Sequence, residues 1–350
     1  MAKNPRPQHI LVIRLSALGD VAMLVPVLHG LQTSYPELKI TLLTRGFLAP
    51  IFQELSNVEV FSVETKGKHK GFFGLWKLYR ELAPKSFTAV ADVHNVLRSN
   101  ILKLFFKTGS IPFFQIDKGR SEKKALTREN DKIFKPLKTT HQRYAEVFEA
   151  LGYALDLEQF SFLKKQSVPE QMSHLLGEKI PNQWIGIAPF AAHEGKMYPL
   201  EMMVEVIDIL NCNADYQIVL FGGGTKEIEK FAEIAKSRDR VFSVAGELSL
   251  DEELALISNL DVMVAMDSGN AHLAANYGIP VITIWGVTHP YTGFYPFGQP
   301  EDNALLPDRD EFPLLPTSVY GNKVPKGYEN VMETILPEQV VEKISKVLAV

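Results

Sequence analysis

Cysteine is almost absent from this sequence of 350 residues. The single thiol, Cys212, cannot form an internal disulfide, and no group of Cys and His residues has the spacing of a zinc site. The chain has no uncharged apolar run of about 18 residues, the length that a membrane-spanning helix needs. Its first strand is not followed by a Gly-x-Gly-x-x-Gly motif. These absences argue against a disulfide scaffold, a zinc protein, an integral membrane protein and a nicotinamide-dependent dehydrogenase.

Charge of one sign is not in excess either. The 37 Lys and Arg residues face 41 Asp and Glu residues, a formal net charge of −4. This balance excludes a globally basic nucleic-acid binder and still permits a local basic patch. The apolar run near the N-terminus is short and is interrupted by Arg14, so it is not a signal peptide. We therefore expect a cytoplasmic protein.

Short β-branched segments alternate with longer segments of helical period, which is the pattern of a parallel sheet covered by helices. The length predicts two domains, at about 150 residues each. We expect an α/β protein with two Rossmann-like, doubly wound halves that face a central cleft. The predicted strands are His9–Leu15, Lys39–Arg45, Val58–Val63, Phe87–His94, Ile111–Asp117, Ile185–Phe190, Tyr216–Gly222, Val241–Ala245, Asp261–Met266 and Val281–Trp285.

The domain boundaries follow from the same pattern. Residues 1–165 form the predicted first domain, residues 166–336 the second, and residues 337–350 a final helix. Leu155–Gln183 has weak periodicity and two prolines, which indicates a linker region, and residues 300–326 are expected to be surface loop. Further helices are predicted at Val21–Tyr35, Gly71–Lys85, Thr139–Tyr153 and Ser249–Leu260, the last with a capping box between Ser249 and Glu252.

The first motif joins the first strand to the first helix and runs from Arg14 to Asp20. Gly19 permits a tight turn there, which places Asp20 at or near a helix N-terminus. Asp20 is either a reactive carboxylate or a simple N-cap, since Asp is favoured at that position. Arg14 is either part of the same site or a surface charge.

The second motif is Met266-Asp-Ser-Gly-Asn-Ala-His272, again between a strand and a helix. Free amides at a helix start bind anions, and Gly269 lets the backbone approach a ligand closely. Asp267, Ser268 and Asn270 are equally suited to capping a structural helix. His272 alone is compatible with packing or with solvent exposure.

Two loops in the second half complete the set of candidate residues. Lys196 follows the first strand of that half, where a positioned cation can neutralise a diphosphate leaving group; a solvated lysine is the alternative. Gly222 opens a run of three glycines at a later strand end. These glycines give a nucleotide room, and Glu227 could accept ribose hydroxyls; plain turn glycines remain the alternative.

Basic residues are concentrated between Lys118 and Lys138. Eight Lys or Arg residues, among them Lys123, Lys124 and Arg128, face three acidic residues, which leaves a local excess of five positive charges. A second cluster is Lys66-Gly-Lys-His-Lys70. Such blocks are often solvated loops, but they also suit an anionic glycolipid at a membrane surface.

Two segments resemble a known family. Ser-Ala-Leu-Gly-Asp20 followed by Val-Pro-Val-Leu resembles the N-terminal signature of glycosyltransferase family 9, the ADP-heptose:lipopolysaccharide heptosyltransferases. Met266-Asp-Ser-Gly-Asn-Ala-His-Leu-Ala-Ala275 followed by Pro-Val-Ile-Thr-Ile-Trp-Gly286 resembles its donor motif. The likeness covers nearly the whole chain. The sequence differs from the best-known members at Asn270, His289 and Tyr291–Phe297.

The resemblance implies a GT-B fold and an inverting transfer of a heptose from ADP-heptose, or a related donor, to a lipopolysaccharide core. It implies no metal, and we expect no other cofactor. The charge balance predicts no nucleic-acid partner, and the basic segment predicts an anionic glycolipid acceptor and peripheral contact with the inner face of the inner membrane. The implied catalytic residues are Asp20, as general base, and Lys196, which contacts the donor phosphates. The implied donor-binding residues are Asp267, Gly269, Asn270, His272, Glu227 for the ribose and the Leu248 backbone for the adenine. The motifs themselves add Ser268 and Gly222 to the predicted donor-binding residues. The predicted acceptor-binding residues are Arg14, Lys123, Lys124 and Arg128.

Two other functions remain compatible with the sequence. One is a nucleotide-sugar epimerase or hydrolase of GT-B-like fold, and the other is a nucleotide-sugar-binding protein without catalysis. A carboxylate such as Asp20 opposite a donor site has no purpose in a pure binder, which favours an enzyme. Release of free sugar without any acceptor would identify a hydrolase.

Overall fold

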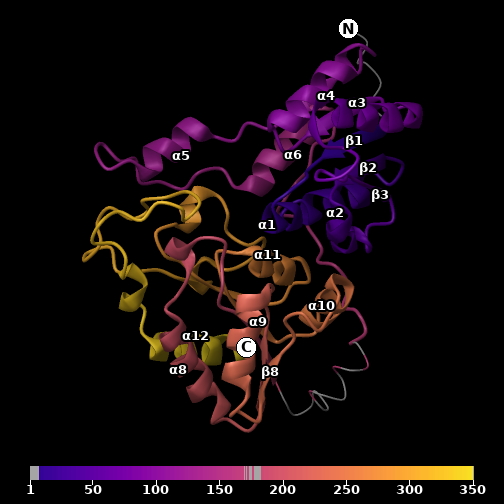
Figure 1. The fold of residues 1–350 in the computed structure, drawn as a ribbon. Coiled ribbons are helices and arrows are strands. Elements are labelled where there is room, and N and C mark those ends of the chain that lie inside the picture. The colour runs from indigo at the N-terminus through magenta and orange to yellow at the C-terminus, as the bar shows by residue number, and fades with distance from the viewer. Residues whose placement is uncertain (1–7, 169, 171, 173–175, 177–182, 350) are drawn as a thin grey trace. The chain divides into compact units, whose positions relative to one another are not determined.

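The computed structural model describes residues 8–168, 170, 172, 176 and 183–349 and consists of two compact units (Figure 1). Unit 1 comprises Met1–Lys118 and Thr140–Phe162, and unit 2 comprises Gly119–Thr139 and Leu163–Val350. Part of the predicted linker Leu155–Gln183 lies outside the described residues. Within the part of the chain that is described, no helix has the length and apolar character needed to cross a bilayer.

Unit 1 is built on a parallel sheet of five strands in the order β3-β2-β1-β4-β5. Its central strands are buried on both faces, as parallel sheets are when helices cover them. The strands are β1 (His9–Ile13), β2 (Lys39–Thr44), β3 (Val58–Ser62), β4 (Ala89–Asp92) and β5 (Phe113–Gln115). Its helices are α1 (Leu18–Ala22), α2 (Val25–Ser34), α3 (Gly71–Leu82), α4 (Leu97–Lys107) and α6 (Thr140–Ala150), with 3-10 turns η1 (Gly46–Phe52) and η2 (Ala83–Lys85).

Unit 2 repeats this arrangement with one more strand, in the order β11-β10-β9-β6-β7-β8. The strands are β6 (Gln183–Ala188), β7 (Tyr216–Leu220), β8 (Val241–Ser243), β9 (Val262–Met266), β10 (Val281–Ile284) and β11 (Ala304–Leu305). Its helices are α5 (Arg120–Thr127), α8 (Leu200–Asn211), α9 (Thr225–Ala235), α10 (Leu250–Ile257), α11 (Gly269–Asn276) and α12 (Pro337–Leu348). The 3-10 turns are η3 (Glu194–Lys196), η4 (Pro290–Thr292), η5 (Glu301–Asn303) and η6 (Val331–Thr334).

The ten predicted strands are all present, each within a few residues of its expected ends. The capping box at α10 is confirmed, because the Glu252 amide donates to Ser249 Oγ and the Ser249 amide donates to Glu252 Oε2. The helix predicted at Val21–Tyr35 is divided into α1 and α2. The prediction of surface loop for residues 300–326 is wrong in part, because β11 extends the second sheet and Ser318 is buried.

The segment Gly119–Thr139, which carries α5, packs with unit 2 although it lies between β5 and α6 of unit 1 in sequence. Phe134 contacts the rings of His289 and Tyr291, at 5.1 and 4.9 Å between centroids. The Lys132 ammonium donates to the Pro316 carbonyl at 2.7 Å. The predicted first domain, residues 1–165, had included this segment. His289 and Tyr291, in the second half of the chain, therefore hold Gly119–Thr139, a segment from the first half.

Candidate functional site

Both sheets reverse their strand order at one point, and the predicted site residues follow the strands at these points. In unit 1 the reversal falls between β1 and β4, and in unit 2 between β6 and β9. Open α/β sheets bind ligands at the carboxyl ends of the strands beside such a switch point, because the connecting loops diverge there. Each unit thus presents a candidate half-site.

In unit 1 the half-site centres on Asp20, the third residue of α1. Its Oδ2 lies 2.6 Å from a terminal guanidinium nitrogen of Arg14, which follows β1. The Arg14 side chain is 8% exposed and also donates to the Val93 carbonyl at 2.8 Å, whereas the Asp20 side chain is 29% exposed. The ion pair therefore fixes the orientation of a carboxylate that still reaches solvent.

Two further side chains, which sequence reasoning missed, hold the backbone at the two ends of the Arg14–Asp20 motif. His94, two residues beyond β4, accepts the Leu15 amide on Nδ1 at 3.3 Å. Burial, and then the charge of Arg14, lower the pKa of His94 to about 3, so its ring is neutral at physiological pH. Tyr144 of α6 is fully buried and donates its hydroxyl to the Asp20 carbonyl at 3.1 Å. The only signal in the sequence was that His94 ends a predicted strand.

In unit 2 the half-site centres on a buried ion pair. The Lys196 ammonium, at the end of η3, lies 2.7 Å from Oδ2 of Asp267, which directly follows β9. The two side chains are 14% and 4% exposed. Thr288, beyond β10, donates its hydroxyl to the same carboxylate oxygen at 3.1 Å. The sequence predicted the two charged residues separately, and the structure brings them together.

Glycines hold Lys196 in place, and sequence reasoning did not find them. Gly321 has a φ of +79°, and a Cβ on this residue would overlap Cγ of Lys196. A Cβ on Gly195 would lie 2.6 Å from the Gly321 carbonyl oxygen. The Ser318 hydroxyl accepts the Gly321 amide at 3.0 Å and so fixes this backbone. The loop around Gly321 therefore packs directly on the aliphatic part of the Lys196 side chain.

The start of α11 lies next to this ion pair. Ser268 is its N-cap residue and Gly269 its first helical residue. Ser268 Oγ is buried and has no hydrogen-bond partner among the described residues, so it does not cap the helix. Asn270 lies in the first turn, and His272 is buried within the helix. An unsatisfied hydroxyl beside free helix amides is suited to binding an anion.

The remaining predicted donor residues lie at the neighbouring strand ends. Glu227, in the first turn of α9, accepts the Gly223 amide on Oε2 at 2.7 Å. A Cβ on Gly222 would approach that carboxylate oxygen to 2.6 Å, which explains the glycine there. Leu248 is half-buried directly before the α10 cap. The strand order places these groups on the β7 and β8 side of Lys196.

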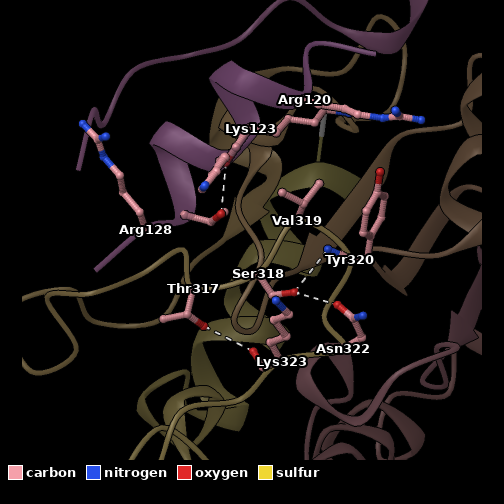
Figure 2. A pocket seen from close by; sticks show the side chains of 11 residues that line it. Arg120, Lys123, Arg128, Thr317, Ser318, Val319, Tyr320, Asn322 and Lys323 are labelled. Carbon is pink, nitrogen blue, oxygen red and sulfur yellow. Dashed lines mark hydrogen bonds between the residues drawn. The ribbon is translucent and has the colours of Figure 1, made fainter. Parts of the chain in front are cut away.

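The predicted basic residues line a pocket of about 570 Å³ in unit 2. Figure 2 shows α5 on one wall and the loop from Thr317 to Lys323 on the other. Its lining includes five cationic side chains and, among the described residues, no carboxylate. The cationic residues are Arg120, Lys123, Lys124, Arg128 and Lys323.

Lys123 differs from the other cations of the pocket, because it is buried and its ammonium lies 4.2 Å from the centre of the Phe294 ring. It therefore helps to dock α5, while Lys124 and Arg128 are exposed. Arg14, the fourth predicted acceptor residue, does not join them, since it is buried beside Asp20 in unit 1. The loop that lines the pocket is also the one that packs on Lys196.

The described residues contain no cluster of three His, Cys, Asp or Glu side chains that could hold a metal ion. The sequence has one Asp-x-Asp pair, Asp308 and Asp310. Oδ1 of Asp308 accepts the Asp310 amide at 2.8 Å, which closes a local turn.

Comparisons with known proteins identify relatives along nearly the whole chain. The model of glycosyltransferase family 9 (heptosyltransferase) matches residues 75–310. Lipopolysaccharide core heptosyltransferase OpsX of Haemophilus influenzae is 26% identical over 81% of this chain and 80% of its own.

Two solved structures have a similar fold. A glycosyl transferase family 9 protein from Veillonella parvula has a TM-score of 0.75 at 20% identity, over 98% of this chain and 97% of its own. The Escherichia coli heptosyltransferase WaaC with ADP has a TM-score of 0.67 at 20% identity, over 97% and 99%. The fold class expected from the sequence, GT-B with two Rossmann-like α/β units, is confirmed.

Proposed function

This chain belongs to glycosyltransferase family 9, the heptosyltransferases, and on that premise we propose that it transfers a heptose from ADP-heptose to the core of a lipopolysaccharide. Support comes from a relative named as a lipopolysaccharide core heptosyltransferase and from a similar structure solved with ADP. The observation that carries the proposal is the Lys196–Asp267 pair beside the start of α11 at the switch point of unit 2.

The donor diphosphate binds at this place in unit 2. The amides of the first turn of α11 and the buried hydroxyl of Ser268 donate to the phosphate oxygens. Lys196 supplies positive charge that stabilises the departing diphosphate. Asp267 and Thr288 hold its ammonium in place. Asp267 also lies beside the donor sugar, and His272 supports the first turn of α11 from within the helix.

The donor nucleoside extends along the strand ends toward β7 and β8. Glu227 faces the ribose, and the Leu248 backbone contacts the adenine. Gly222 contributes by leaving room, because any side chain there would meet the Glu227 carboxylate. Support for this direction comes from the strand order, which continues from Lys196 to these loops without interruption.

Asp20 of unit 1 is the general base. It removes the proton from an acceptor hydroxyl as that oxygen attacks the anomeric carbon of the donor, which inverts the configuration. Arg14 acts through Asp20, since its guanidinium is buried and fixes one carboxylate oxygen. Arg14 is thus a positioning residue. A carboxylate so held contributes through orientation, which can supply several kcal/mol of a barrier.

The acceptor carries negative charge, and the cationic pocket of unit 2 binds it. A lining that contains five cationic residues and, among the described residues, no Asp or Glu favours a phosphate or carboxylate group over a neutral sugar. Because the same loop lines this pocket and packs on Lys196, an anion held there lies close to the donor phosphates.

No metal ion is needed for this reaction, because Lys196 and the α11 amides replace a divalent cation at the diphosphate. Turnover should be unchanged in EDTA. The variant Asp308→Asn/Asp310→Asn, which removes the one Asp-x-Asp pair, should also be fully active. Strict dependence on added Mg²⁺ or Mn²⁺ would contradict metal independence.

The donor is tested by thermal shift with ADP, UDP, GDP and CMP. A nucleotide at 100 times its Kd stabilises a protein by about 2.7 kcal/mol, so the preferred base is identified directly. ADP should give the largest shift, and Lys196→Met should abolish it. A larger shift with UDP or GDP would contradict an ADP-sugar donor. Release of free heptose without acceptor would identify a hydrolase instead.

The acceptor pocket is tested by the variant Lys124→Gln/Arg128→Gln/Lys323→Gln, which changes both walls at exposed positions. The KM for an anionic acceptor should rise, while the ADP shift stays as in the wild type. The matched control neutralises three exposed lysines elsewhere in unit 2. It is the triple glutamine variant of Lys230, Lys236 and Lys346. An equal rise of the acceptor KM in both variants would contradict the proposal that this pocket binds the acceptor.

A further inference from the structure

Unit 1 exposes large apolar side chains on α3 and α4. Phe73 on α3 is 84% exposed and Leu97 on α4 is 76% exposed, the highest values among the large apolar side chains of the described chain. Phe72, Trp76 and Leu104 are also exposed on these two helices. Single exposed apolar residues need no explanation, but a contiguous group of them marks a binding surface.

The two helices lie side by side (Figure 1), and we call their exposed apolar side chains the apolar band. The ring of Phe105 on α4 lies 5.5 Å from that of Phe72 and 5.1 Å from that of Trp76. Leu97 and Leu104 are two helical turns apart and so share the outward face of α4. Phe105 lies about 100° around the helix from Leu104, on the side that contacts α3. We call the exposed face of α3 and α4 the α3–α4 surface.

Cations outnumber carboxylates beside the band, although the loop before α3 also carries one exposed carboxylate, Glu64, which lies 3.7 Å from Lys68. α4 contains no acidic residue, and α3 contains only Glu81, which is engaged by His69 and Lys68 at 3.2 and 3.3 Å. The second basic cluster of the sequence directly precedes α3. The exposed cations of α3, α4 and this loop are Lys66, Lys68, Lys70, Lys77, Arg80, Arg98 and Lys107.

We propose that the α3–α4 surface binds an anionic phospholipid bilayer. The apolar side chains enter the interfacial region of the lipid, where Trp and Phe are favoured. The long Lys and Arg side chains of the same helices and of the preceding loop reach the headgroup phosphates. No residue of this surface belongs to the donor site or to the cationic pocket, so the proposal goes beyond heptose transfer and stands independently of it.

The charge pattern favours a bilayer over a second copy of the chain. A symmetric dimer through this face would place the same surface on both subunits. Its cations would then lie opposite cations, and like charges across an interface are costly. An anionic membrane complements the apolar band and the surrounding charge at the same time.

The binding is measured by flotation with vesicles and by tryptophan fluorescence. Trp184 and Trp285 are buried in unit 2, at 2% and 0% exposed, so Trp76 reports contact at the α3–α4 surface. Vesicles in which a quarter of the phosphatidylcholine is replaced by phosphatidylglycerol should shift the emission to the blue and carry the protein upward. Vesicles of phosphatidylcholine alone should do neither, and added salt should weaken the binding.

Two variants separate the apolar and the charged contributions. Phe73→Ser/Leu104→Ser changes exposed side chains and should abolish flotation, whereas Ile209→Ser/Leu336→Ser, at exposed positions of unit 2, should not. Lys77→Gln/Arg98→Gln/Lys107→Gln should weaken binding about five-fold for each charge removed. The Lys230, Lys236 and Lys346 variant is the matched charge control. Circular dichroism and thermal melting confirm that each variant is folded.

Wild-type levels of flotation in the apolar variant would overturn the proposal. So would equal binding to both kinds of vesicle. A wild-type dimer that becomes monomeric in the Phe73 and Leu104 variant would show that a second copy covers the surface instead. Transfer to a soluble acceptor without fatty acids should be unaffected by every α3–α4 variant. Failure of that transfer in the wild type would refute the enzyme proposal while leaving vesicle binding as evidence for this one.

Discussion

Removing both partners of the Lys196–Asp267 pair should cost clearly less stability than the sum of the losses from removing each one alone. At 2.7 Å and an effective dielectric constant of about 20, the two charges attract each other by about 6 kcal/mol. Most of this is offset by the loss of hydration, which is several kcal/mol for each ion. The intact pair is therefore nearly neutral for stability, but each partner left alone becomes a buried charge without compensation.

Lys196→Met and Asp267→Asn should thus each lower the stability of unit 2 by about 3–5 kcal/mol. The double variant should lose clearly less than the sum, with a coupling energy of about 2 kcal/mol or more. Urea unfolding in a Trp76→Phe background measures this directly, because the two remaining tryptophans both lie in unit 2. Asparagine is chosen at position 267 because its side-chain oxygen can still accept the hydrogen bond that the Thr288 hydroxyl donates to Asp267.

The two single variants should also differ toward ADP. Asp267→Asn keeps the ammonium that meets the phosphates, so ADP should still stabilise the protein, whereas Lys196→Met should lose that effect. Additive stability losses in the cycle would show that the two charges do not depend on each other. In that case the reasoning from the geometry of the pair would be refuted.

Four further outcomes follow from the structure. Asp20→Asn should lower turnover about 10²–10⁴-fold while ADP binding stays unchanged. Near-normal turnover would contradict the assignment of Asp20 as the general base. Because the pKa of His94 is lowered to about 3 by burial, its native ring stays neutral while the unfolded chain takes up protons as the pH falls below about 6.5. The contribution of His94 to the free energy of unfolding is fully present above that pH, and about 2 kcal/mol of it should be lost at pH 5. Urea titrations of His94→Gln should not show this loss. Gly321→Ala should reduce ADP binding, because its Cβ would displace Lys196; an unchanged thermal shift would exclude this. Burial raises the pKa of Glu253 to about 7. The free energy of unfolding should therefore fall as the pH rises from about 4.5 to 7, because the unfolded chain ionises this carboxyl first. Glu253→Gln should be about 1–2 kcal/mol more stable than wild type at pH 8 but not at pH 4.

The strands and most helices could be predicted because their signals are local. Alternation of β-branched segments with helical period located every strand of both sheets except β11, which has only two residues, Ala304 and Leu305. Strand order is a property of long-range pairing and is not written in any window of sequence. The expected fold class implied that β1 lies beside β4, but the contact of His94 with the Leu15 amide that this adjacency permits could not be anticipated.

The charged residues of the candidate site were predictable, but not what holds them. Asp20, Lys196 and Asp267 follow strand ends in recognisable motifs. Gly321 lies in a segment without periodicity, and its role depends on close approach to a side chain far away in the sequence. Charge alone also could not show that Lys123 is buried against an aromatic ring while its neighbours on α5 remain exposed.

The excursion of Gly119–Thr139 onto unit 2 changes how the two units are joined. The polypeptide passes between them three times, after Lys118, after Thr139 and after Phe162. No single proteolytic cut therefore divides the chain into two fragments that each correspond to one unit. A protein truncated after residue 162 would keep Gly119–Thr139 but lose the residues of unit 2 on which Phe134 packs. The amino-terminal half expressed alone should therefore expose this segment and aggregate.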